Sequence, residues 1–116
     1  MRSMGLSAAL LSDDVMFASQ LQAAMRRAHG TLALVVGDAL PQVDTVFVDL
    51  NSQIDSRLQK IAELRGERPG LAIVGFCHHA ERELRRRALA AGATRVVNNG
   101  ALQVVALRLA GVNVRS

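Results

Sequence analysis

The stretch Val46-Phe47-Val48-Asp49-Leu50-Asn51 places a carboxylate directly after an unbroken apolar run. An apolar run without alternation is typical of a strand that is covered on both faces, as in a parallel sheet. Four further runs of this kind are spread along the chain, at residues 8–11, 32–36, 71–74 and, more weakly, 96–97. We therefore expect five buried strands, of which 46–48 is the third.

Amphipathic stretches separate these apolar runs. Residues 17–28 carry apolar side chains at helical spacing, and Asp13 or Asp14 stands where it would cap such a helix, with Gly30 just beyond its end. The other helical stripes span residues 54–62, 84–91 and 102–109. The alternation of short strands with helices is typical of a doubly wound α/β fold.

One connection is too short for the usual crossover helix. Only residues 37–44, which include Pro41, join the second predicted strand to the third, whereas a parallel crossover normally takes a dozen residues or more. Eight extended residues still reach about 26 Å, and the return over one neighbouring strand needs roughly 19 Å. We therefore predict a flavodoxin-like, five-stranded parallel sheet of order 2-1-3-4-5, with the second helix missing or reduced to a turn. All 116 residues fit a single domain.

Three carboxylates follow two strands that are neighbours in this order. Asp13 and Asp14 end the first predicted strand and Asp49 ends the third. Ligand sites of open α/β sheets form at the carboxyl ends of the strands. Crowded carboxylates favour a hard cation such as Mg²⁺, and a carboxylate held there has the chemistry of a nucleophile toward a phosphoryl group. The alternative interpretation makes Asp13 and Asp14 helix caps and Asp49 a turn residue.

The order and spacing of three motifs resemble the receiver domains of two-component response regulators over roughly residues 6–110. The motifs are Leu11-Ser12-Asp13-Asp14, Val46-Phe47-Val48-Asp49-Leu50-Asn51 and Ala88-Leu89-Ala90-Ala91-Gly92-Ala93. The resemblance implies that Asp49 is the phosphoacceptor. It also implies a Mg²⁺ site formed by the side chains of Asp13, Asp14 and Asp49 with the backbone carbonyl of Asn51.

The chain departs from the receiver pattern at the residues that sense the phosphoryl group. Cys77 stands where receivers carry the switch Ser or Thr, Asn99 where they carry an invariant Lys, and Val96 where they carry the switch aromatic. A Lys ammonium neutralises phosphoryl charge through strong charge-assisted bonds. Asn99 brings no charge, and a thiol is a weak donor. The resemblance therefore implies a pseudo-receiver with weakened phosphorylation switching.

Four functions remain open at this point. The first is a receiver-like signalling module that binds a protein partner or itself through the 81–109 region, the face that the family uses. The second is a competent receiver, phosphorylated on Asp49 by a histidine kinase with Mg²⁺. The third is a small basic nucleic-acid-binding domain, since the chain has a formal charge of +4 and an Arg-rich helix. The fourth is a thiol-dependent enzyme at Cys77, beside His78 and His79.

Composition weighs against several of these classes. Aromatic residues make up only 3%, with no Trp and no Tyr, so stacking platforms for nucleic-acid bases are not expected. The arginines of the 82–87 stretch alternate with Glu81 and Glu83, as on a solvated helix face with internal ion pairs. One cysteine excludes an internal disulfide, and no apolar run approaches the roughly 20 residues of a membrane span. We expect a cytoplasmic protein that is not an enzyme.

Overall fold

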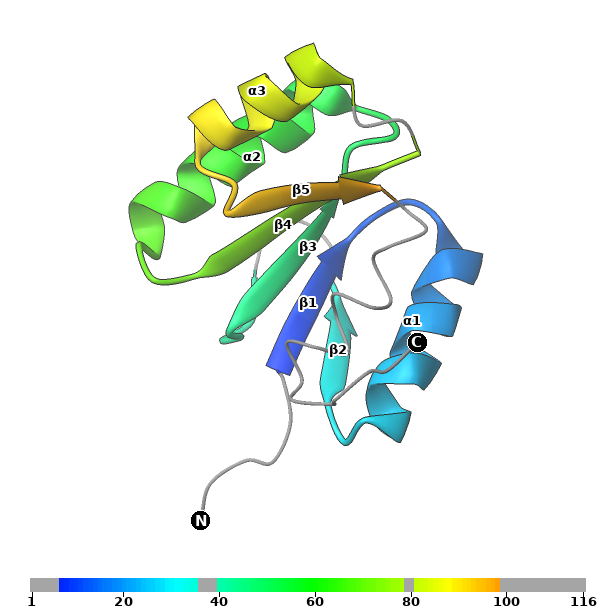
Figure 1. Cartoon of the computed structure of the whole chain (residues 1–116). Helices are drawn as coiled ribbons and strands as arrows, with labels where there is room; N and C mark the ends of the chain where they lie inside the picture. The colour runs from blue at the N-terminus through cyan, green and yellow to red at the C-terminus, as the bar shows by residue number, and fades with distance from the viewer. Residues whose placement is uncertain (1–6, 36–39, 79–80, 99–116) are drawn as a thin grey trace.

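The computed structural model describes residues 7–35, 40–78 and 81–98. Over these residues five parallel strands form one sheet in the order β2-β1-β3-β4-β5 (Figure 1). The strands are β1 (Ser7–Leu11), β2 (Thr31–Leu34), β3 (Thr45–Asp49), β4 (Ala72–Cys77) and β5 (Arg95–Asn98), and the helices are α1 (Val15–Arg27), α2 (Ile54–Glu67) and α3 (Arg82–Ala91). The predicted fold class and strand order are confirmed.

The helices cover both faces of the sheet, with α1 on one side and α2 with α3 on the other (Figure 1). Successive side chains of a strand point to opposite faces, so Phe47 packs with Leu21 and Met25 on the α1 side. Val46 and Val48 pack on the α2 side. Every residue of β3 is buried. This two-sided burial is the physical reason why the apolar run of β3 does not alternate with polar residues.

Both ends of α1 are capped by local hydrogen bonds. The Asp14 side chain accepts a hydrogen bond of 2.9 Å from the Phe17 backbone amide, which confirms that Asp14 caps this helix. At the other end the Gly30 amide donates to the Met25 carbonyl over 2.8 Å. His29, with φ of 62°, takes the left-handed position that ends the helix, and Gly30 follows it.

The connection from β2 to β3 has no helix in residues 40–44, its described part. Leu40 and Val43 pack against the core on the α2 side instead. Arg68, just after α2, donates to the Leu40 and Pro41 carbonyls, over 2.7 Å each. Residues 40–44 are therefore held by Arg68 without a helix, in agreement with the predicted loss or reduction of the second helix over this described part. The helix predicted at 102–109 lies outside the described residues.

Candidate functional site at the carboxyl ends of β1 and β3

The sheet brings the ends of β1 and β3 together. Leu11 pairs with Val48 in the parallel register, so Ser12 and Asp49 are the next residues at that edge. Asp49 is the last residue of β3 and is only 5% exposed. The predicted adjacency of the first and third strands is confirmed, and with it the placement of Asp13 and Asp49 at one edge of the sheet.

The Asp49 carboxylate is surrounded by donors from its own chain. The Ser12 hydroxyl donates to Oδ2 over 2.6 Å. The backbone amide and the side-chain amide of Asn51 both donate to Oδ1, each over 2.8 Å. A buried carboxylate is tolerated only when such donors replace its water shell. Ser12 and the Asn51 side chain were not predicted to contact Asp49, although both residues belong to the motifs that resemble receiver domains.

Asn51 also joins this edge to β4. Its side-chain oxygen accepts a hydrogen bond of 2.7 Å from the backbone amide of His78, which directly follows Cys77. The Asn51 side chain therefore fixes the position of the β4 end relative to Asp49. The predicted role of the Asn51 backbone carbonyl as a metal ligand stays a prediction.

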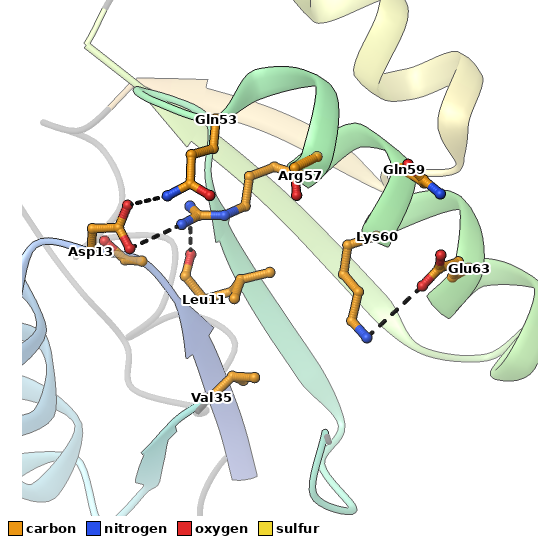
Figure 2. A pocket seen from close by; sticks show the side chains of 10 residues that line it. Leu11, Asp13, Val35, Gln53, Arg57, Gln59, Lys60 and Glu63 are labelled. Carbon is orange, nitrogen blue, oxygen red and sulfur yellow. Dashed lines mark hydrogen bonds and ion pairs between the residues drawn. The ribbon is translucent and has the colours of Figure 1, made fainter. Parts of the chain in front are cut away.

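A buried arginine from α2 lies across the same edge. Arg57 is 5% exposed, and its Nη1 donates to the backbone carbonyls of Asp49, over 2.8 Å, and Leu11, over 3.4 Å. Its Nη2 lies 3.3 Å from Asp13 Oδ1 (Figure 2). Arg57 was not among the predicted site residues. The signal was present, because Arg57 follows Ile54 by three residues and precedes Ile61 by four, which puts a cation on the apolar face of the helix.

Asp13 and Asp14 serve different purposes. The Asp13 side chain, 61% exposed, binds Arg57 and accepts a hydrogen bond of 2.7 Å from the Gln53 side chain (Figure 2). The Asp14 carboxylate turns to the α1 amide instead. Within the ranges 7–35, 40–78 and 81–98, no three His, Cys, Asp or Glu side chains gather closely enough to hold a metal ion.

The carboxylate oxygens at this edge are already engaged. Both oxygens of Asp13 and both oxygens of Asp49 accept at least one hydrogen bond or ion pair from the chain itself. As arranged, these oxygens do not fit a Mg²⁺ ion, since they already have partners and the guanidinium of Arg57 lies 3.3 Å from Asp13 Oδ1. Ligation by Asp13, Asp14, Asp49 and Asn51 stays a prediction that only a metal titration tests.

Cys77, the last residue of β4, is buried at 3% exposure. Desolvation by burial raises the pKa of its thiol. The positive charge of Arg85 opposes this shift, and the charges of Asp49 and Glu81 add to it. A thiol held protonated is a poor nucleophile, so this environment speaks against thiol catalysis. His79 and Asn99 lie outside the described residues.

The arginines of α3 are largely engaged within the domain. Arg86 pairs with Glu83 over 2.6 Å, and Arg87 pairs with Asp55 of α2 over 2.8 Å. Arg85 donates to the Val96 carbonyl over 2.6 Å. The interpretation of this stretch as a helix face with internal ion pairs is confirmed for Arg86, whereas Arg87 and Arg85 bind α2 and β5.

A groove of about 480 Å³ lies beside the acidic edge, between the ends of β1 and β2 and the helix α2 (Figure 2). Leu11 and Val35 line its apolar side, and Lys60 and Glu63 line its helical side. Figure 2 shows Lys60 directed toward Glu63, at 4.0 Å, and away from Asp13.

Comparisons with known proteins identify the fold. No family model matches the chain, and no curated protein matches it. A solved protein related to pilus assembly, from Burkholderia pseudomallei, is 19% identical, with 99% of this chain and 96% of that chain covered at a TM-score of 0.75. A response regulator from Thermotoga maritima is 14% identical, with 90% and 92% covered at a TM-score of 0.77.

A third solved structure is a response regulator from Burkholderia pseudomallei, with a phosphorylated aspartic acid, a calcium ion and citrate. It is 20% identical, with 88% of this chain and 66% of that chain covered at a TM-score of 0.75. The chain therefore has the fold of response-regulator receiver domains, and its structural neighbours are receivers of two-component type and pilus-assembly-related proteins. In the described part of the chain, no helix is long and apolar enough to cross a membrane.

Proposed function

We propose that this chain is a receiver-like signalling and interaction module of two-component type, in which phosphorylation of Asp49 is at most a weak switch. The observation that carries the proposal is the enclosure of Asp49. Asp49 is 5% exposed, and both of its carboxylate oxygens are bound by donors from Ser12 and Asn51. Donors that stabilise the carboxylate's negative charge lower its nucleophilicity, so each bond raises the barrier to phosphorylation.

The switch position supports the same proposal. In a receiver, a hydroxyl at the end of the fourth strand follows the phosphoryl group, and here that residue is Cys77. A thiol is a weak donor and would bind a phosphoryl oxygen poorly. We further propose, from the sequence pattern, that Asn99 replaces the invariant Lys and therefore supplies no charge to the phosphoryl group.

We propose that the module works by binding a protein partner or a second copy of itself, as a single domain of 116 residues in the cytoplasm. The face that we assign to this contact is the 81–109 region, whose described part contains α3. Leu89 of α3 is 45% exposed, and the two arginines that precede it by two and three residues already have acidic partners. One structural neighbour is described as related to pilus assembly, and service in such an assembly is the setting that we propose.

A second function, that of a receiver phosphorylated on Asp49 by a histidine kinase with Mg²⁺, is favoured by one observation. Asp49 occupies the end of the third strand in a fold shared with a neighbour that carries a phosphorylated aspartic acid. In this alternative the chain is still not an enzyme, beyond accepting its own phosphoryl group.

The two functions separate in one experiment. Thermal unfolding and amide NMR spectra are recorded with Mg²⁺ alone and with Mg²⁺ plus beryllofluoride, a mimic of the phosphoryl group. We expect no additional shift with beryllofluoride. A shift that is present in the wild type and absent in Asp49→Asn would overturn the pseudo-receiver proposal in favour of the competent receiver.

A further inference from the structure

Arg57 is a buried cation in a position where burial is costly. A guanidinium that loses its water must regain hydrogen bonds and a counter-charge within the protein. Arg57 does so with three partners, the carbonyls of Leu11 and Asp49 and the carboxylate of Asp13. These partners belong to the ends of two neighbouring strands and to the residue that begins the turn after β1, so one side chain connects both strand ends.

The same strand ends bring two negatively charged carboxylates to one part of the molecule. Asp13 and Asp49 stand at one edge of the sheet, and two carboxylates there repel each other unless a cation lies near them. Arg57 brings such a cation from α2. The positive charge of Arg57 is present at this end of the sheet whether or not Mg²⁺ is in solution.

We propose that Arg57 is the resident cation of this edge, a positioning residue that takes the place of a divalent metal and keeps metal ions from binding there. This inference goes beyond the proposed function, since it concerns the charge balance at the edge with or without a phosphoryl group. A divalent ion that approached Asp13 would meet the guanidinium at close range, and the repulsion between like charges would weaken its binding.

The neighbouring cation of the groove does not have this role. Lys60 also lines the groove, but its ammonium lies 4.0 Å from the carboxylate of Glu63, and Figure 2 shows it directed away from Asp13. Arg57 and Lys60 therefore form a natural pair for comparison, because both carry one positive charge on α2 and line the groove, and Arg57 pairs with Asp13 whereas Lys60 pairs with Glu63.

The proposal is tested by titrating the full chain with Mn²⁺, without any phosphodonor, and following the paramagnetic broadening of the amide signals of Asp13, Asp49 and Asn51. We expect no selective broadening in the wild type. Arg57→Gln removes the charge and keeps a polar amide, on a shorter side chain, at this position. We expect it to bind Mn²⁺ at these residues about 10-fold more tightly, or better, than the wild type.

Control variants separate charge from folding. Arg57→Lys keeps the charge and should stay as insensitive to Mn²⁺ as the wild type, and Lys60→Met should do the same. Adding Asp49→Asn to Arg57→Gln should abolish the gained binding. Selective broadening of the wild type with the affinity of Arg57→Gln would overturn the proposal, as would a folded Arg57→Gln that binds no better than Lys60→Met.

The wild-type titration tests the proposal even if Arg57→Gln does not fold. Selective Mn²⁺ binding at Asp13 and Asp49 of the unaltered chain would contradict a resident cation. The absence of such binding, together with an Arg57→Lys variant that is also insensitive to Mn²⁺, would support one. The outcome is also independent of the beryllofluoride experiment. A domain that ignores beryllofluoride but binds Mn²⁺ would refute the resident cation and leave the pseudo-receiver standing.

Discussion

The two helical layers are attached to the sheet in different ways. On one side, α1 packs through apolar side chains: Leu21 and Met25 are fully buried, and the ring of Phe17 lies 5.3 Å from that of Phe76. On the other side, α2 adds directional polar contacts to its apolar ones. Arg57, Arg65 and Arg68 each donate to backbone carbonyls of strand ends or loops.

The difference follows from what each helix has to cover. The α1 layer meets a continuous apolar surface, where volume and shape decide the packing. The α2 layer meets the end of β3, residues 40–44 and the end of α3, where carbonyl oxygens need donors. A guanidinium has five donors in a fixed fork and serves several carbonyls at once. Volume changes should therefore damage the α1 side most, and changes of donor geometry the α2 side.

The largest effect is expected for Leu21→Ala, which tests the α1 side. Leu21 is fully buried, so the change removes transfer free energy and leaves a cavity. We expect the free energy of unfolding to fall by about 3 kcal/mol. Urea unfolding measures this change. Leu21→Met, which nearly conserves volume, serves as the control, and a loss for Leu21→Ala no greater than that of the control would show that the α1 layer is loosely packed.

The next effect is expected for Arg65→Met, which tests the α2 side. Arg65 donates to the Gly92 carbonyl over 3.0 Å and to the Pro69 carbonyl over 2.7 Å, and it joins α2 to the end of α3. We expect a loss of about 2 kcal/mol in unfolding free energy, because a charged donor is removed from several carbonyls.

Arg65→Lys sharpens this prediction. A lysine keeps the charge but not the fork, so it should restore less than half of the lost stability. Full rescue by lysine would mean that charge alone, and not donor geometry, holds the α2 layer in place.

A smaller effect is expected for Asp14→Ala, at the start of α1. The change removes the acceptor for the Phe17 amide and should cost about 1 kcal/mol. Asp14→Asn retains an acceptor and should cost less. If Asp14 were a metal ligand as well as a cap, the loss for Asp14→Ala would grow when Mg²⁺ is present, which thermal unfolding with and without Mg²⁺ would reveal.

The smallest effect is expected at Cys77, through pH. Burial raises the pKa of its thiol, so the native state holds this proton more tightly than the unfolded state, whose thiol has a pKa of about 8.5. The stabilisation is complete below that value and is lost as pH rises through the pKa of the folded state. Between pH 8 and pH 10, wild-type stability should fall more steeply than that of Cys77→Ala, and parallel curves would contradict the shift.

Much of the fold could be predicted from local pattern. The unbroken run of 46–48 indicated a strand buried on both faces, and the eight residues between the second and third strands indicated a connection without a full helix. Both are confirmed, the latter over residues 40–44. Such predictions succeed because burial leaves a periodic signature in the residues themselves.

The candidate site was predicted only in outline. Sequence order placed Asp13, Asp14 and Asp49 after neighbouring strands, and it left open which acid caps α1 and which faces the sheet edge. The structure assigns the cap to Asp14 and a contact with Arg57 to Asp13. Which of the two acids caps α1 depends on where the backbone turns after Leu11, and the positions of the acids in the sequence do not predict that turn.

The sequence by itself determined the strands, the helices of the described residues and the end of the sheet at which the acids stand, because these follow from periodicity and from the rule that ligand sites lie at strand ends. Only the tertiary structure decided that Ser12 and Asn51 enclose Asp49 and that Arg57 supplies a cation to the edge. Arg57 is separated from Asp13 by more than forty residues of chain. Their contact exists because α2 packs its cation-bearing face over the ends of β1 and β3.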